Sequence, residues 1–375
     1  MPFERLFSSD NENTTSKTVA ALQKGQIIVL PTETVYGLAV RAYDEAAVQR
    51  LIQLKNRPEN HPFALACSGI ELVNDFVPDM EPLAQRLVRR CLPGPISLVL
   101  DVPACESDFY FLPPTVQNVV SQTIDQKRTV GFRVPNHSLT LNILKELGEP
   151  VILTSANRTG QSEKKTVDEI IIELGKEIDL IVDDGDRSEA KSSTILRVSD
   201  GQYSILRDGM FKRETLERLT AQMILFVCTG NTCRSPMAER ICEFLIAQRL
   251  HCSLNQLEEY GIVVLSAGVA VGYTAPANPH AIEVLRRKGL DLTDHRSQQL
   301  NETHVRFADH IFTMTRNHRE TILSLWPSAD ARLNVLRTDG GDIADPFGCS
   351  ESVYAASAHQ IELEIGKRLD EILER

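Results

Sequence analysis

A cysteine and an arginine, Cys228 and Arg234, are separated by five residues in the segment Cys-Thr-Gly-Asn-Thr-Cys-Arg-Ser-Pro. The apolar residues 223–228 are typical of a buried strand, and residues 236–246 have the pattern of an amphipathic helix. A strand-to-helix loop of this length can wrap into a cup, with backbone N–H groups pointing inward at the helix N-terminus. Such a cup binds phosphate, so the segment predicts a phosphate-binding loop.

The residue types in this loop indicate nucleophilic chemistry on the bound phosphate. The field of the helix N-terminus should hold Cys228 as a thiolate, the nucleophilic form, and Arg234 can donate to two phosphoryl oxygens. Asp345, before Pro346, offers a carboxylic acid to protonate a leaving group. The alternative is a structural cysteine in an ordinary turn, with Asp345 an ordinary loop residue. The predicted catalytic residues are therefore Cys228, Arg234 and Asp345.

Other loop residues are suited to shaping the cup. Gly230 and Asn231 tolerate a left-handed backbone, and Ser235 is suited to cap the following helix. The supporting residues of the predicted loop are Thr229, Gly230, Asn231, Thr232, Cys233 and Ser235.

With these motifs, residues 223–375 resemble a low-molecular-weight protein tyrosine phosphatase along their whole length. Residues 229–239, 266–268 and 345–348 are most similar to the bacterial branch that includes protein arginine phosphatases. The resemblance implies that Cys228 is the nucleophile, Arg234 the phosphate binder and Asp345 the general acid, with Asn231 and Ser235 as supports and no cofactor. It also implies that Cys233 can trap an oxidised Cys228 as a reversible disulfide.

Thr232 bears on the substrate of this half. Tyrosine-specific members of the family carry a bulkier apolar residue at this position, whereas the phosphoarginine branch carries threonine. A hydroxyl could orient a guanidinium, while an aliphatic side chain would pack on an aromatic ring. We therefore favour phosphoarginine over phosphotyrosine in a protein substrate, and both remain open.

The first half of the chain places small polar side chains where predicted strands end. Residues 31–37 and 154–157 follow apolar runs, and Ser193 precedes another; two cations, Lys55 and Arg57, end a predicted helix. Groups of these types at strand ends could line a cationic pocket for a nucleotide. Each also has an ordinary interpretation, as a turn former or a solvated helix end.

The joint pattern is more specific. Residues 31–37, 55–58 with 61–63, 93–95, 131–135, 154–157 and 193–194 occur in the order and spacing of the YrdC-like threonylcarbamoyl-AMP synthases. The resemblance covers roughly residues 15–210. It implies a twisted, mixed α/β fold with a large open cavity. It also implies that L-threonine, bicarbonate and ATP are converted to threonylcarbamoyl-AMP and pyrophosphate, for threonylcarbamoyladenosine modification of tRNA by a partner.

Several residues of this half receive a role from the resemblance. Thr34 and His61 would contact threonine. A magnesium ion is expected with the ATP, for phosphate neutralisation. The residues that would contact ATP or line its cavity are Lys55, Arg57, Arg133, Thr154, Ser155, Asn157, Ser193 and Arg207.

The elements that must position these residues form two α/β domains. We expect a flexible N-terminus at 1–14, a YrdC-like domain at 15–211, a linker at 212–222 and a phosphatase domain at 223–375 with a doubly wound parallel sheet. Predicted strands lie at 26–30, 96–100, 129–134, 151–154, 180–182, 194–198, 204–206, 223–228 and 310–314. Predicted helices lie at 46–55, 82–91, 139–147, 167–176, 212–221, 236–246, 279–288, 316–325 and 352–373.

Composition limits the other classes of function. The chain has 40 Lys and Arg against 51 Asp and Glu among 375 residues, a net charge of −11, and both halves are mildly acidic. This argues against direct tRNA binding, which would favour a basic surface. No apolar run approaches the length of a membrane-spanning helix, and no secretory signal is recognisable, so we expect a cytoplasmic protein without a membrane partner. The eight cysteines lack zinc-site spacing, and most should be reduced thiols.

A second hypothesis stays open at this point. The first half could be a non-catalytic module that binds a nucleotide or RNA, with the phosphatase as the only catalyst. The sequence does not show why two such halves share one chain.

Overall fold

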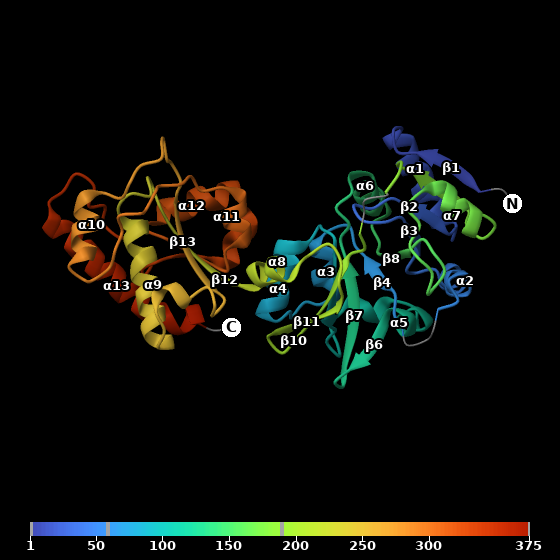
Figure 1. The fold of residues 1–375 in the computed structure, drawn as a ribbon, viewed down its shortest axis with the longest axis horizontal. Helices are drawn as coiled ribbons and strands as arrows, with labels where there is room; N and C mark the ends of the chain where they lie inside the picture. The colour runs from blue at the N-terminus through green and yellow to red at the C-terminus, as the bar shows by residue number, and fades with distance from the viewer. Residues whose placement is uncertain (1–2, 58–60, 188–190, 374–375) are drawn as a thin grey trace. The chain divides into compact units, whose positions relative to one another are not determined.

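The apolar runs in the first half of the chain form strands of a single mixed sheet (Figure 1). The computed structural model describes residues 3–57, 61–187 and 191–373, so Pro58 of the Lys-Asn-Arg-Pro motif lies outside the described residues. Two compact units are distinguished, Met1–Leu216 and Glu217–Arg375. The strands of the first sheet, in order, are β1 (Glu4–Phe7), β9 (Leu180–Asp183), β2 (Ile28–Leu30), β3 (Gly37–Arg41), β8 (Val151–Ser155), β4 (Ala64–Ala66), β7 (Lys127–Arg133), β5 (Ile96–Asp101), β10 (Thr194–Ser199) and β11 (Gln202–Arg207), with β6 (Ser121–Ile124) paired to β7.

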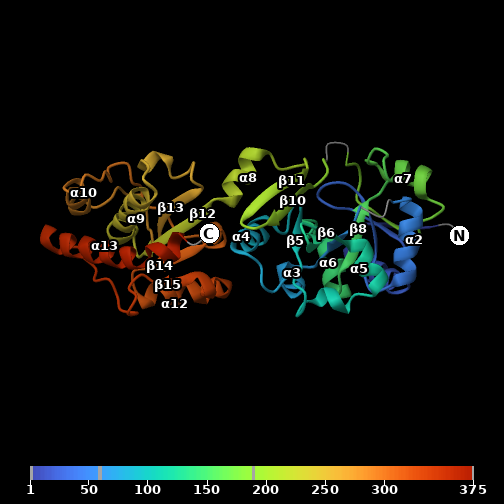
Figure 2. The same cartoon turned by 90° about the horizontal axis from the view of Figure 1, so that it is seen from below.

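The pairing in this sheet is both parallel and antiparallel. For example, β9 runs parallel to β2, while β3 is antiparallel to both β2 and β8. The helices of this unit are α1 (Asn11–Gln23), α2 (Glu45–Lys55), α3 (Ile70–Phe76), α4 (Pro82–Cys91), α5 (Pro114–Val120), α6 (Ser138–Leu147), α7 (Val167–Leu174) and α8 (Arg213–Thr220). Figure 2 shows α2 and α5 side by side. The expected mixed α/β fold is confirmed.

A hydrophobic cluster holds α1 and α6 against this sheet. Leu22 of α1 and Ile143 of α6 are fully buried with Ile28 and Leu30 of β2. Burying a side chain of this size stabilises the fold by about 1.5–3 kcal/mol. The cluster therefore anchors β2, whose carboxyl end leads into residues 31–37.

The N-terminal segment differs from the expected flexible tail. Residues Glu4–Phe7 form β1, which pairs in parallel with β9, and α1 begins at Asn11. Leu6 is buried in the same cluster as Leu22, and Thr14 is buried as well. The polar residues 8–13 conceal this because they form only the turn and the start of the helix.

The second unit contains a four-stranded parallel sheet in the order β13 (Ile262–Gly268), β12 (Gln222–Cys228), β14 (His310–Thr313) and β15 (Leu333–Val335). Side chains of β12 alternate between two cores: Ile224 and Phe226 pack on one face, Leu225 and Val227 on the other. Helices cover both faces, which confirms the doubly wound sheet. They are α9 (Arg234–Leu250), α10 (Pro279–Arg286) and α13 (Glu351–Leu373) on the first face, and α11 (Glu302–Phe307) and α12 (Arg316–Leu325) on the second.

Most predicted elements agree with the structure to within two residues at each end; α9 is longer than predicted, beginning at Arg234 and ending at Leu250. The elements that were not expected are strands β1, β3, β4, β6, β13 and β15 and helices α1, α3, α5 and α11. Within the described residues, no helix is both long and apolar enough to cross a membrane.

Two candidate active sites

The predicted phosphate loop joins β12 to α9. Cys228 ends the strand and is 3% exposed, and Arg234 opens the helix. Two groups contact the sulfur: the Asn231 N–H donates to Sγ at 3.3 Å, and the Ser235 hydroxyl lies 2.9 Å from it. Ser235 is not the helix cap that we expected, because Cys233 occupies that position. Its hydroxyl is instead available to stabilise the cysteine sulfur.

Asn231 holds the shape of the loop. It is fully buried and adopts a left-handed backbone with φ +54°, while Gly230 does not. Its side-chain amide donates to Ser235 Oγ at 2.9 Å and to Ser266 Oγ at 2.8 Å, and its Oδ1 accepts the Gln298 N–H at 2.9 Å. These bonds tie the loop to β13 and to the segment before α11.

Arg234 and Asp345 meet beside the loop, although 110 residues lie between them in the chain. Arg234 is 4% exposed; its Nη2 donates to Asp345 Oδ2 at 2.7 Å, and its Nη1 to the Ile343 carbonyl at 3.0 Å. The buried Nε has no hydrogen-bond partner among the described residues. An unpartnered buried N–H is costly, so this donor is available for an anion.

Two residues that sequence reasoning missed also support the loop. His318 of α12 lies 2.9 Å from both the Thr229 and the Thr315 hydroxyls through its two ring nitrogens. Burial, with a smaller effect of Arg234, lowers the pKa of His318 to about 4, so the ring is neutral at neutral pH. The Tyr354 hydroxyl of α13 lies 3.1 Å from Cys233 Sγ, and burial raises the pKa of that thiol. Neither residue belongs to a recognisable sequence motif, because both lie far along the chain from the loop.

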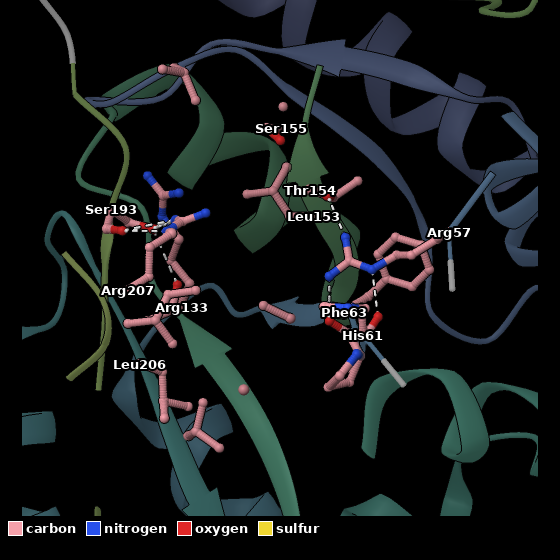
Figure 3. Close-up of a pocket in the computed structure, with 18 of the residues that line it drawn as sticks. Arg57, His61, Phe63, Arg133, Leu153, Thr154, Ser155, Ser193, Leu206 and Arg207 are labelled. Carbon is pink, nitrogen blue, oxygen red and sulfur yellow. Dashed lines mark hydrogen bonds between the residues drawn. The ribbon is translucent and has the colours of Figure 1, made fainter. Parts of the chain in front are cut away.

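The first unit contains a cavity of about 440 Å³. Figure 3 shows Arg57, His61 and Phe63 on one side of it, and Arg133, Ser193 and Arg207 on the opposite side. Thr154 and Ser155, at the end of β8, lie between the two sides. Seven predicted residues thus line one cavity: Arg57, His61, Arg133, Thr154, Ser155, Ser193 and Arg207.

The other three predicted residues lie behind this lining. Thr34 is fully buried and accepts a hydrogen bond from Arg133 Nη2 at 2.6 Å. Lys55 is 2% exposed; its ammonium donates to the Ser155 carbonyl at 2.9 Å and to Asn157 Oδ1 at 3.1 Å. Thr34, Lys55 and Asn157 therefore support lining residues, and their own contact with a substrate stays a prediction.

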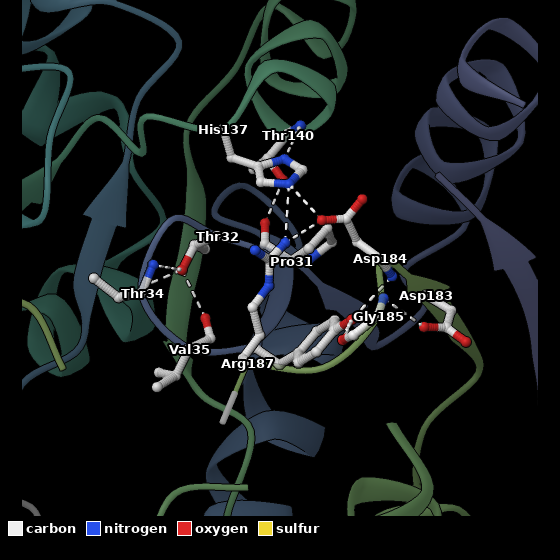
Figure 4. A network of polar contacts seen from close by, with 11 residues as sticks. Pro31, Thr32, Thr34, Val35, His137, Thr140, Asp183, Asp184, Gly185 and Arg187 are labelled. Atoms are coloured by element: carbon white, nitrogen blue, oxygen red, sulfur yellow. Dashed lines mark hydrogen bonds and ion pairs between the residues drawn. The ribbon is translucent and has the colours of Figure 1, made fainter. Parts of the chain in front are cut away.

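A network of polar contacts fixes the 31–36 loop at the edge of the cavity (Figure 4). The Thr140 hydroxyl donates to the Pro31 carbonyl, and the Thr32 hydroxyl to the Val35 carbonyl, both at 2.6 Å. The Tyr36 hydroxyl donates to the Gly185 carbonyl at 2.7 Å. Beside it, His137 and Arg187 both contact the Asp184 carboxylate, which holds residues 183–187 against α6.

The cavity is strongly cationic. Burial, assisted by Arg57, lowers the pKa of Lys55 to about 8. Burial also lowers the pKa of Arg57 to about 10, and the charge of Arg207 on the facing side adds to the effect. The cavity is lined by Arg57, Arg133 and Arg207, with Lys55 directly behind the lining, and these partly buried positive charges favour an anionic ligand.

Comparisons with known proteins agree with the two-unit description. A model of the Sua5, YciO and YrdC proteins, described as "Telomere recombination", matches residues 20–209, and a model of "Low molecular weight phosphotyrosine protein phosphatase" matches residues 223–375. The threonylcarbamoyl-AMP synthase of Bacillus subtilis is 30% identical over 209 residues, which are 56% of this chain and 57% of the relative. The chain thus spans little more than half the length of that synthase.

The second unit has a relative that it covers almost completely. The protein-arginine-phosphatase of Geobacillus stearothermophilus is 40% identical over 154 residues, 40% of this chain and 95% of the relative. A solved structure of a Sua5 variant from P. abyssi superposes with a TM-score of 0.51 at 22% identity, covering 70% of this chain and 90% of the other, which supports the fold alone. The chain therefore belongs to the Sua5, YciO and YrdC family through its first unit and to the low-molecular-weight phosphotyrosine protein phosphatase family through its second.

Proposed function

We propose that the second unit is a cysteine-dependent protein phosphatase. The observation that carries the proposal is the unpartnered Nε of Arg234, buried beside a loop that converges on the Cys228 sulfur. A phosphoryl group in the cup would accept from this N–H and from the loop. By accepting hydrogen bonds from Arg234, the phosphoryl group would replace Asp345 as the partner of this arginine, and Asp345 could then face the leaving group.

The reaction proceeds in two steps. The Cys228 thiolate attacks phosphorus, an S–P bond forms, and the bond to the leaving nitrogen or oxygen breaks as Asp345 gives that atom a proton. Water then attacks the phosphocysteine, Asp345 takes a proton from the water, and phosphate leaves with regeneration of the thiolate. Ser235 and Asn231 stabilise the sulfur when it is the leaving group.

The preferred substrate is protein phosphoarginine, supported by Thr232 and by the arginine phosphatase relative. Thr232 is half-buried, and its hydroxyl lies 3.7 Å from Cys233 Sγ at the rim of the cup. Thr232→Ile should shift the ratio of kcat/KM values from phosphoarginine toward phosphotyrosine by about tenfold or more, because one methyl-sized change is worth about 1–3 kcal/mol. The measurement compares the two phosphopeptides, with Thr232→Ser as the control that keeps the hydroxyl. An unchanged ratio in Thr232→Ile would contradict the assignment.

For the first unit, we propose synthesis of threonylcarbamoyl-AMP from L-threonine, bicarbonate and ATP. The observation that carries it is the cavity in which Arg57 faces Arg133 and Arg207, large enough for a nucleotide and a small amino acid. Threonine amine and bicarbonate give a carbamate and water; a carbamate oxygen then attacks the α-phosphorus and pyrophosphate leaves. No protein nucleophile is needed, so the residues act by positioning and electrostatics.

Magnesium fits this cavity only together with substrate oxygens. The described residues contain no group of three or more His, Cys, Asp and Glu side chains that could hold a metal ion. Among the residues that the structure describes, one carboxylate lines the cavity, and Mg²⁺ is commonly held by one or two carboxylates plus substrate phosphates. When bound, the ion would supply charge neutralisation on the triphosphate.

The decisive experiment is pyrophosphate release from the full chain with ATP and bicarbonate, with and without threonine. Threonine-dependent release supports the synthase, whose product would pass to a tRNA-modifying partner. ATP binding without any such release would leave a nucleotide-binding module in its place.

The pH dependence of ATP binding follows from Lys55. Its ammonium is present below its pKa of about 8 and is lost as the pH rises through that value. Because Lys55 lies behind the lining and holds Ser155 and Asn157, loss of its charge should weaken ATP binding above pH 8 through these residues, by less than about tenfold per pH unit. Calorimetry between pH 7 and 9.5 tests this, and Lys55→Arg should flatten the profile because a guanidinium stays charged. A flat profile in the unmodified chain would exclude the role.

A further inference from the structure

Glu163 is the one acidic side chain among the described residues lining the cavity. It precedes α7 and is half-buried. The Ser192 hydroxyl donates to its Oε1 at 2.6 Å, and Ser192 adjoins Ser193, which Arg207 contacts. The carboxylate is therefore oriented by a neighbouring strand end and lies on the Ser193 side of the cavity.

The nearby cations are engaged elsewhere. Arg207 donates to the Ser193 carbonyl at 2.8 Å, Arg133 to Thr34 at 2.6 Å, and Arg57 to the Pro62 carbonyl at 2.6 Å. Lys164, next in the chain, pairs with Glu173 at 2.6 Å. The ion pairs among the described residues do not include Glu163. Its charge does reach the cavity cations, because it opposes the burial that lowers the pKa of Arg207.

A free carboxylate is unexpected in a cavity for a triphosphate, since it would repel the ligand. The repulsion turns into attraction if a divalent cation lies between carboxylate and phosphate. Magnesium ions are held in this way, by one or two carboxylates together with phosphate oxygens. An ammonium group on the ligand could also neutralise the Glu163 carboxylate. However, Glu163 lies beside Ser193 and Arg207, which the proposed synthase uses to bind the nucleotide.

We propose that Glu163 is the protein ligand for the divalent cation that accompanies the nucleotide in this cavity, with Ser192 as the residue that orients it. The inference rests on the proposed nucleotide binding of the first unit.

The test measures ATP binding to the full chain by calorimetry, once with Mg²⁺ and once with EDTA. In the unmodified chain, Mg²⁺ should tighten binding. In Glu163→Gln, that Mg²⁺ effect should shrink by about tenfold or more, the usual scale for losing a group that holds a metal, while binding in EDTA becomes tighter. Mn²⁺ gives a second readout: its electron paramagnetic resonance signal with ATP should show a ternary complex in the unmodified chain and a weakened one in the variant.

Matched variants separate the cation role from a general loss of charge. Glu146→Gln removes the same charge from the exposed face of α6 and should leave the Mg²⁺ effect unchanged, and Ser192→Ala should weaken it partially. Thermal unfolding checks that Glu163→Gln is folded. The proposal is overturned if Glu163→Gln keeps the full Mg²⁺ effect, if it tightens ATP equally in both buffers, or if only threonine binding is lost. Absence of any ATP binding to the unmodified chain would overturn the proposed function and this assignment together.

Discussion

Replacing Cys228 by serine is expected to lower the phosphatase activity of the full chain by a factor of about 10⁴ or more, the scale seen when a catalytic nucleophile is removed. In the structure, the Asn231 N–H donates to the Cys228 sulfur, and the Ser235 hydroxyl contacts it. A serine hydroxyl at this position would be a much weaker nucleophile, because these contacts do not ionise it. The substitution is nearly isosteric, so the buried strand end should keep its packing. Hydrolysis of an aryl phosphate measures the effect.

The control for this variant is the other unit of the same chain. ATP binding and pyrophosphate release should be unchanged in Cys228→Ser, which would show that the first unit is intact, and thermal unfolding would check that the second unit is folded. Asp345→Asn should retain more activity on an aryl phosphate, whose leaving group needs little help from an acid, than on phosphoarginine. Hydrolysis by Cys228→Ser at more than a tenth of the normal rate would exclude the nucleophilic mechanism.

Arg57→Met is expected to lower threonine-dependent pyrophosphate release by about 100-fold, the scale of removing one fixed charged donor from a reaction site. Arg57 is held on one side of the cavity by the Pro62 carbonyl at 2.6 Å and by Thr154 Oγ1 at 3.2 Å. Its guanidinium also lies 4.3 Å from the centre of the Phe63 ring. These contacts orient the positive charge toward the cavity, and methionine keeps the apolar stem without the charge.

Two comparisons make this result specific. Arg57→Lys should recover little activity, because an ammonium cannot reproduce the planar, two-pronged hydrogen bonding of a guanidinium. Aryl phosphate hydrolysis by the second unit should be the same in all three proteins. If Arg57→Met releases pyrophosphate at half the normal rate or faster, Arg57 does not bind the reacting phosphates.

Much of the fold was predictable because its signals are local. Pro82 and the amphipathic pattern that follows predict α4, and the structure has the helix at Pro82–Cys91. By contrast, β3 at Gly37–Arg41 and β13 at Ile262–Gly268 were missed. Small residues interrupt the apolar pattern at the ends of both strands. In the structure, β3 pairs with the adjacent β2 and the distant β8, and β13 pairs with β12, so their strand conformation depends on the assembled sheets.

The phosphate loop was predictable from local sequence, because the nucleophile, the backbone donors and the arginine all lie within one strand-to-helix turn. The sequence also placed small polar residues of the first unit at strand ends and two cations, Lys55 and Arg57, at the end of a helix. Which residues of the first unit face the cavity depends on how its elements pack: Lys55 and Thr34 lie behind the lining, and Glu163 belongs to it. Likewise, His318 and Tyr354 reach the loop only through sheet order and helix packing. Contacts between distant residues depend on how elements pack, and no short segment carries that information.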